Sequence, residues 1–155
     1  MPVGALGGKA AVMDILDNSG EPTGLYHSGT FAGNHFTLAA GLATLRALTP
    51  EVYEHLNALR ARLEANLQDV LAHSGHPYHL FSQGSTVRVY FSEVPVRSHR
   101  DNSEVDGELF SRLVIGLLVK GYYARDGMGF ILSNPMTEDH VDGLAQAVYE
   151  VLKEG

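Results

Sequence analysis

The sequence has no cysteine, only three lysines, and no apolar run long enough to cross a bilayer. Without cysteine the chain has no disulfide, no thiolate metal site and no cysteine nucleophile. A membrane-spanning helix needs about 18 consecutive apolar residues, which no stretch supplies. Residues 1–20 lack the basic start and long apolar core of a secretory signal peptide. These absences predict a soluble, cytoplasmic protein.

Positive charge is scarce as well. The formal net charge is −7, from 11 Lys and Arg against 18 Asp and Glu. Because binding to a nucleic-acid backbone needs clustered basic residues, and the arginines here are scattered, we expect no nucleic-acid partner. The chain has 155 residues, of which 45% are hydrophobic and 19% charged. That composition is globular, and the length fits one ordinary domain or a small domain with an appendage.

The clearest periodic signal is a long helix after residue 49. Thr49 is a suitable N-cap, Pro50 suits the first helical position, and Gly75 suits the position just after a helix. One apolar stripe runs between them, and it comprises Val52, Leu56, Leu59, Leu63, Leu67 and Val70. The pattern predicts a helix with one buried face.

The rest of the second part alternates between strand and helix signals. Residues 86–91 alternate like a half-buried strand, and residues 96–104 read as a polar loop. We expect helices over 105–121 and after Thr137, and two short strands, 122–124 and 130–133, around the Asp126-Gly127 pair. The predicted fold is α+β, with helices packed on one face of an antiparallel sheet.

Residues 1–48 do not continue this pattern. They contain a short helical segment over 9–16 and an apolar segment near helical spacing over 36–48. We interpret them as an incomplete piece of another domain, with apolar surface meant for a partner. The predicted boundaries are 1–48 for this piece and 49–155 for a small α+β domain.

The loop "YHSGTFAGNH", residues 26–35, places Ser28, Gly29 and Thr30 just ahead of Gly33 and an apolar segment. Backbone N–H groups and hydroxyls at the start of a helix favour phosphate binding. Ordinary loops are also rich in Ser, Gly and Thr, so the spacing alone leaves both interpretations open.

Two longer stretches decide between those interpretations. "PVGALGGKAAVMDIL" and "GLYHSGTFAGNHFTLAAGLATLRAL" resemble the C-terminal third of class III, fold-type I aminotransferases, which use pyridoxal 5′-phosphate (PLP). Within that family, glutamate-1-semialdehyde aminomutases and β-amino-acid aminotransferases are the most similar. The most specific motif is Gly-Thr-x-x-Gly-Asn, here residues 29–34, and the resemblance continues through the strand, hairpin and last helix.

The resemblance implies a small C-terminal domain preceded by a remnant of the PLP-binding large domain. It also implies that the turn lies at a dimer interface, where Thr30, with Gly29 and Ser28, contacts the phosphate of PLP bound mostly by the other subunit. Arg125 would bind a substrate carboxylate at the mouth of the site. The alternative for Arg125 is an exposed turn residue paired with Asp126.

The same resemblance exposes a missing residue. In the family a Lys that holds PLP as a Schiff base lies a few residues before the Pro-Val-Gly stretch, which here begins at Pro2. Lys9, Lys120 and Lys153 sit at helix ends or in the tail, where solvating or structural roles are expected. We therefore predict no catalytic residue here and no transamination by this chain alone.

Two other functional classes are considered. The chain could be a non-enzymatic dimerisation or interaction module that buries residues 31–48 against a partner. It could also be a small hydrolase using His27 and Ser28, although Tyr26 and Thr30 stand where a Gly-x-Ser-x-Gly elbow needs glycines.

A histidine cluster is the one candidate metal site. His73, His76 and His79 recur at intervals of three, but Gly75 and Pro77 interrupt any helix that would bring them together. A solvated loop is the alternative, and we predict no metal site.

Overall fold

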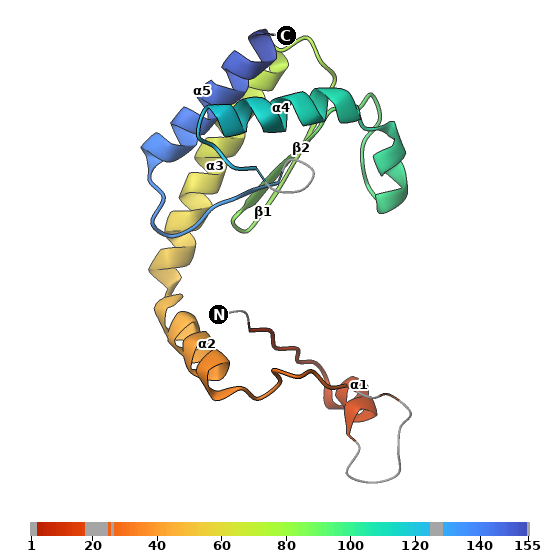
Figure 1. Cartoon of the computed structure of the whole chain (residues 1–155), viewed down its shortest axis with the longest axis vertical. Coiled ribbons are helices and arrows are strands. Elements are labelled where there is room, and N and C mark those ends of the chain that lie inside the picture. The colour runs from red at the N-terminus through yellow and green to blue at the C-terminus, as the bar shows by residue number, and fades with distance from the viewer. Residues whose placement is uncertain (1–2, 18–24, 26, 125–128, 155) are drawn as a thin grey trace. The chain divides into compact units, whose positions relative to one another are not determined.

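The structure is a computed structural model that describes residues 3–17, 25, 27–124 and 129–154. The chain divides into two compact units, Met1–Thr49 and Pro50–Gly155, which are described separately below (Figure 1). No helix among the described residues is both long enough and apolar enough to cross a membrane.

The second unit is a layer of helices on a small sheet (Figure 1). Its sheet is antiparallel with the order β1-β2-β3. Its strands are β1 (His79–Gln83), β2 (Thr86–Tyr90) and β3 (Gly129–Ile131), and its helices are α3 (Pro50–Ala72), η2 (His99–Glu104, a 3-10 helix), α4 (Gly107–Val119) and α5 (Glu138–Lys153). Helix α3 contacts β1, β2 and α5, and α5 also contacts α4. The α+β fold predicted from the sequence is confirmed.

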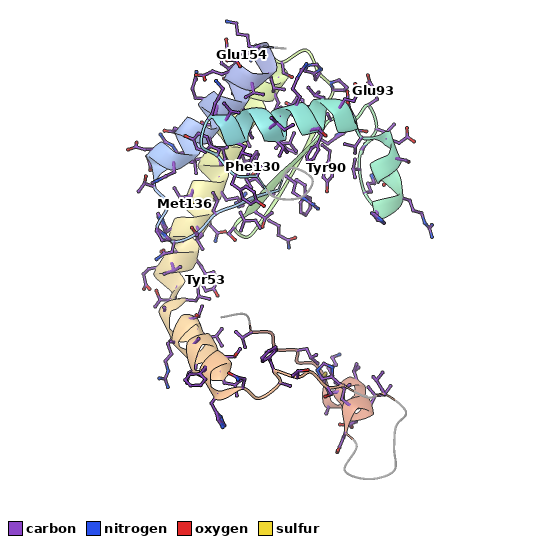
Figure 2. The ribbon with its side chains drawn as sticks, in the orientation of Figure 1. Tyr53, Tyr90, Glu93, Phe130, Met136 and Glu154 are labelled. Carbon is purple, nitrogen blue, oxygen red and sulfur yellow. The ribbon has the colours of Figure 1, made fainter. Side chains whose placement is uncertain are left out.

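Leucines on α3 form the centre of the core. Leu59, Leu63, Leu67 and Leu71 recur every fourth residue and are at most 2% exposed. They share one cluster with the inward side chains of the sheet and of the other two helices, namely Val87, Val89, Phe91, Leu109, Leu113, Leu117, Phe130, Leu132, Val141, Leu144, Val148, Val151 and Leu152. Phe130, on β3, is one member of this cluster (Figure 2). Burying one such side chain contributes about 1.5–3 kcal/mol, so this cluster holds the unit together.

The predicted helix starts are confirmed at α3 and α5. Helix α3 begins at Pro50 and ends at Ala72, and Gly75, three residues further on, has a positive φ of 77°. At α5 the hydroxyl of Thr137 and the Nδ1 of His140 lie 2.8 Å apart, and Thr137 N donates to that same Nδ1 over 3.1 Å. This is a capping box in which His replaces the usual Glu or Gln.

The predicted pair of strands at 122–124 and 130–133 is wrong in its first arm. Gly121, with φ 88°, closes α4: its N–H donates to Leu118 O, and the N–H of Tyr122 donates to Leu117 O. Because this Schellman arrangement uses Tyr122 to end the helix, residues 122–124 form no strand. Strand β3 pairs with β2 instead, and the Asp126-Gly127 turn lies outside the described residues.

Two further elements differ from the prediction. Strand β1 was not expected, because His79 to Gln83 has little hydrophobic alternation, and it forms through pairing with β2. The 3-10 helix η2 lies within the loop predicted for 96–104. Both elements depend on contacts with neighbours rather than on a strong local pattern.

Polar side chains connect α3 to α5 on the surface. Arg62 donates from Nε to Oδ1 and from a terminal nitrogen to Oδ2 of Asp142, both over 2.7 Å. Its other terminal nitrogen lies 2.9 Å from Glu138 Oε2, and Asn66 donates to Asp142 Oδ1 over 2.7 Å. The hydrogen bond from Arg62 holds the pKa of Asp142 below its usual range.

The first unit has no comparable core. Its elements are α1 (Ala10–Met13), η1 (Asp14–Leu16) and α2 (His35–Ala47). Among its described residues only Gly41 is buried, under the side chain of Val3. Large apolar side chains that are 45–77% exposed instead cover it, namely Val3, Leu6, Val12, Ile15, Leu25, Phe31, Phe36, Leu38, Leu42 and Leu45. So large an apolar surface is typical of an interface rather than of a free domain.

Close packing between α4 and α5 depends on Gly116. A Cβ at this position would lie 2.6 and 2.7 Å from the two Cγ atoms of Val151. We expect overpacking in Gly116→Ala to destabilise the second unit by about 1–3 kcal/mol. The better helix propensity of Ala should offset roughly 1 kcal/mol of this loss. Urea unfolding measures this. Gly107→Ala, with no atom within 4 Å of its Cβ, is the matched control, and adding Val151→Ala should make Gly116→Ala better tolerated. Equal stability of the two glycine variants would contradict the close contact.

The Arg62–Asp142 pair should give stability a defined pH dependence. A carboxyl whose pKa is lowered by folding stabilises the protein above its unfolded pKa, and this contribution is lost as the pH falls through the folded pKa. Asp142→Asn should therefore lower the melting temperature at pH 7, and its difference from the wild type should shrink below about pH 4. Glu54→Gln, which removes an exposed carboxylate on α3 that makes no ion pair among the described residues, serves as a control. A difference that stays constant down to about pH 2 would contradict the pairing.

Candidate functional site

The turn predicted to bind an anion lies just before α2. Ala32 N donates to Gly29 O over 2.8 Å, and Asn34 N donates to Phe31 O over 3.1 Å. Gly33 links these two bonds with φ 72°, a conformation that side chains with a Cβ rarely adopt. The backbone from 29 to 34 is thus folded into successive tight turns with its first residues exposed.

Asn34 fixes where α2 begins. Its Oδ1 accepts from the N–H of Thr37 over 3.1 Å and from the hydroxyl of Thr37 over 3.2 Å. Asn is among the best N-caps because its oxygen satisfies an N–H that the helix leaves free. Sequence reasoning treated this residue only as part of a motif, although Asn followed three residues later by Thr was a usable capping signal.

The turn leaves a set of donors exposed. In the part of the chain that the structure describes, the N–H groups of Thr30, Phe31 and Gly33 and the hydroxyls of Ser28 and Thr30 have no protein acceptor. The side chains of Ser28 and Thr30 are exposed. Donors without an acceptor, next to a helix N-terminus, are the groups that a phosphate needs.

The local charge suits an anion as well. Although the chain is acidic overall, no Asp or Glu occurs between Glu21 and Glu51. A phosphate at residues 28–30 would therefore have hydroxyls and N–H groups beside it and no neighbouring carboxylate in the sequence. The donor set fits the phosphate group of a cofactor such as PLP.

The three lysines lie in different environments, which bear on whether any of them could act as a nucleophile. The ammonium of Lys120 lies 2.8 Å from Glu150 Oε2 and 3.3 Å from Glu154 Oε1, which raises its pKa. Lys153 Nζ lies 5.6 Å from the ring centre of Tyr149. Lys9 precedes α1 and is exposed. A lysine acts as a nucleophile when its pKa is lowered, so the ion pairs of Lys120 give it the opposite character.

The histidines and the serine considered for hydrolysis or metal binding do not form a common site among the described residues. His27 and Ser28 are exposed, and within the described residues no hydrogen bond joins them. The imidazole Nδ1 of His73 lies 2.8 Å from Asp69 O, and the ring of His76 meets Phe91 edge-on with centres 6.1 Å apart. His79 lies on β1, opposite Tyr90 of β2. Among the described residues no three His, Asp or Glu side chains gather as metal ligands would.

Arg125, the predicted substrate ligand, lies outside the described residues. Its role in binding a substrate carboxylate therefore stays a prediction. The predicted domain boundaries and the cofactor contacts of Ser28, Gly29 and Thr30 also stay predictions.

Comparison with curated proteins yields relatives along almost the whole chain. A glutamate-1-semialdehyde 2,1-aminomutase of Thermus thermophilus is 38% identical over 156 residues, which cover 98% of this chain but 36% of the relative. No family model matches the sequence.

Solved structures agree with that result. An omega-transaminase from Sphaerobacter thermophilus matches with a TM-score of 0.80 and 30% identity, over 95% of this chain and 34% of that protein. A β-phenylalanine aminotransferase from Variovorax paradoxus matches with a TM-score of 0.73 and 36% identity, over 96% of this chain and 34% of that protein. The chain matches the C-terminal third of class III aminotransferases.

The chain spans about one third of the length of the relatives it matches. The small sheet with its helices corresponds to their C-terminal domain. The family resemblance drawn from the Gly-Thr-x-x-Gly-Asn motif is confirmed, and so is the fold that it implied.

The N-cap at Asn34 offers a direct test of how the turn is held. Asn34→Ala should destabilise α2 by about 1 kcal/mol, because the N–H of Thr37 loses its acceptor. Amide hydrogen exchange of residues 37–41 reads this locally, and Asn34→Asp, which keeps the oxygen, should exchange like the wild type. Unchanged exchange in Asn34→Ala would show that the cap does not define the turn.

Proposed function

We propose that these 155 residues are the C-terminal part of a PLP-dependent aminotransferase or aminomutase that moves an amino group on a small amino acid or amino aldehyde. The similarity over 98% of the chain supports the family. The observation that carries the proposed role is the exposed set of donors at residues 28–33, which suits a phosphate group.

In this proposal the turn binds and orients the cofactor through its phosphate. The hydroxyl of Thr30 and the N–H groups of Thr30 and Phe31 donate hydrogen bonds to phosphate oxygens, and Ser28 donates beside them. When bound, PLP supplies the electron sink for reactions at the carbon that carries the amino group. The turn itself moves no proton and makes no covalent bond; it fixes the position of the cofactor.

In this proposal the exposed apolar surface of the first unit is buried against other parts of the enzyme. Its exposed apolar side chains, such as Phe31, Phe36 and Leu45, lie on and next to the turn and α2. We infer that they pack against the rest of the large domain and against a second subunit. A turn covered in this way is shielded from water, which strengthens hydrogen bonds to a phosphate.

The 155 residues alone do not transaminate in this proposal, because no described lysine has the surroundings of a nucleophile. Lys120 is held by two carboxylates, and Lys9 and Lys153 are exposed on helix ends. Arg125 is proposed to bind the substrate carboxylate once the complete site is assembled.

A chimera tests the role of the turn. The C-terminal third of the Thermus thermophilus aminomutase is replaced by this chain, and binding of PLP is titrated by absorbance. Thr30→Ala in the chimera should raise the Kd for PLP about tenfold, because a hydrogen bond to a charged group contributes roughly 1.5–3 kcal/mol. Thr44→Ala, which removes a hydroxyl on α2 that donates to Ala40 O, should leave the Kd unchanged.

Three outcomes count against the proposal. One is equal affinity for PLP in Thr30→Ala and Thr44→Ala. Another is a folded chimera that binds no PLP at all. The third is found on the isolated chain: PLP fixed to Lys9, Lys120 or Lys153 by borohydride, as shown by peptide mass, would overturn the inference that this part supplies no nucleophile.

One observation favours a second function, that of an interaction module. Ten large apolar side chains of the first unit are exposed by 45–77%. Such a surface would associate whether or not PLP is bound. Sedimentation of the isolated chain separates the cases, since a strictly monomeric and stable species would speak against the module.

A further inference from the structure

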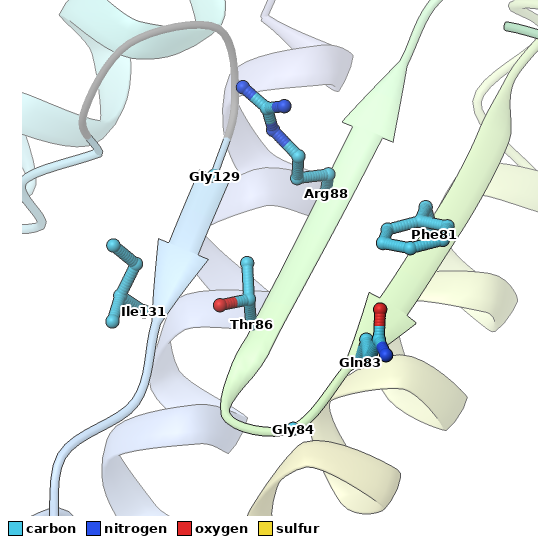
Figure 3. A pocket seen from close by; sticks show the side chains of 7 residues that line it. All are labelled: Phe81, Gln83, Gly84, Thr86, Arg88, Gly129 and Ile131. Atoms are coloured by element: carbon cyan, nitrogen blue, oxygen red, sulfur yellow. The ribbon is translucent and has the colours of Figure 1, made fainter. Parts of the chain in front are cut away.

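The chain passes from the edge of the sheet into α5 through one short connection. Strand β3 ends at Ile131, which lines a hollow of about 520 Å³ beside Arg88, on the open face of the sheet away from the helices (Figure 3). The next residue, Leu132, is buried in the core, and its N–H donates to Ser85 O over 2.8 Å. Residues 133–137 then lead to the first turn of α5. The bonds that hold this segment therefore fix where α5 begins.

Two histidines bond to the end of the segment. His55 Nε2, on α3, lies 3.0 Å from the carbonyl oxygen of Met136, which Figure 2 labels. Because a carbonyl only accepts, this nitrogen of His55 carries a hydrogen. The N–H of Thr137 donates to His140 Nδ1 over 3.1 Å. Because a backbone N–H only donates, this nitrogen of His140 is unprotonated.

An added proton changes these two bonds differently. An imidazolium has a hydrogen on both ring nitrogens, so His55 still donates to the oxygen of Met136. On His140 a hydrogen on Nδ1 removes the only acceptor that the structure gives to the N–H of Thr137 among the described residues. The hydroxyl of Thr137, 2.8 Å from the same nitrogen, can rotate and accept, but the backbone N–H cannot. Protonation therefore breaks the backbone bond of the capping box.

Nearby charges offset this loss only in part. The cationic ring would lie in the first turn of a helix, where the positive end of the helix disfavours it. Glu138 is paired with Arg62 over 2.9 Å, and Asp139 is an exposed carboxylate with no ion pair among the described residues. An exposed carboxylate stabilises a nearby cation only weakly. The described titratable and charged groups around His140 are Glu138 and Asp139 of α5, Arg62 and His55 of α3, and Tyr122 and Tyr123 before β3.

The first turn of α5 also borders a hollow of about 320 Å³. Met136 and His140 line it from the segment and the first turn, and Phe130, Val141 and Leu144 line it from the core. The last three side chains are at most 8% exposed. Opening the first turn would therefore bring solvent to apolar side chains of the core.

We propose that the capping box of α5 is a pH-sensitive switch operated by His140. With Nδ1 unprotonated, the ring accepts from Thr137 and the first turn stays closed; with Nδ1 protonated, that bond is lost and the turn opens beside the hollow. Because the open turn places no demand on Nδ1, lower pH favours opening and higher pH favours closure. Imidazoles in general change charge between about pH 5 and 8, where carboxylates are ionised. The switch lies within the second unit and depends neither on PLP nor on the turn at residues 28–30.

The protonation state of the ring gives the first test. NMR of the full chain labelled with ¹⁵N should show at pH 8 that His140 carries its hydrogen on Nε2. The amide signal of Thr137 should then shift together with the ring signals of His140 as the pH is lowered to 5. A hydrogen on Nδ1 of His140 at pH 8, or an amide of Thr137 that does not follow the ring, would overturn the proposal.

Hydrogen exchange measures the opening itself. The protection factors of amides 140–144, corrected for the intrinsic exchange rate at each pH, should fall about fivefold in the wild type between pH 8 and pH 5, as expected for loss of a helix cap. His140→Gln keeps an acceptor that does not titrate in this range, so its protection should stay constant. His140→Ala should be less protected and equally constant. His73→Gln, which removes an exposed histidine just after α3, should behave like the wild type.

Each outcome of the exchange experiment decides the proposal. A fall in the wild type and in His73→Gln that is absent from both variants of His140 supports the switch. No fall in the wild type, a fall that persists in either variant of His140, or a fall that disappears in His73→Gln would overturn it. Should one variant of His140 not fold, the other variant and the ring titration of the wild type decide by the same criteria.

Discussion

The packing of α3 against the sheet and against α5 is the interaction on which the second unit depends. Four leucines at every fourth position present one continuous apolar ridge, which shares a single buried cluster with Val87 and Val89 of β2 and Val148 of α5. An isolated helix gains little from local propensity, so α3 persists because this face is buried. The surface bonds of Arg62 and Asp142 join α3 to α5 at the edge of this packing.

The two units differ in whether their apolar side chains are buried within the unit. In the second unit the leucines and valines cover one another, and the remaining open sheet face combines Phe81 and Ile131 with Arg88. In the first unit α2 carries apolar residues that are not buried within the unit. A small piece of chain cannot bury enough surface to offset its ordering entropy, which is the reason for proposing that this surface packs against a partner.

The turn at residues 28–34 gives the sequence motif a defined backbone geometry. Gly33 adopts the positive φ that the turn needs, and Asn34 starts α2 directly afterwards. Among the described residues, the donors ahead of them are left without protein acceptors and away from carboxylates in the sequence. Backbone geometry and local charge together are what support the phosphate contact proposed for this turn.

The sequence by itself determined the helices with strong local signals and the family. Thr49-Pro50 and the leucine stripe predicted α3, Thr137 predicted the start of α5, and the Gly-Thr-x-x-Gly-Asn motif predicted the relatives. Tertiary structure alone decided β1, the pairing of β3 with β2, and the use of Tyr122 to close α4. The reason is physical: capping and helical periodicity act between residues three or four apart, whereas strand pairing and the hollow beside Arg88 join residues far apart in the chain.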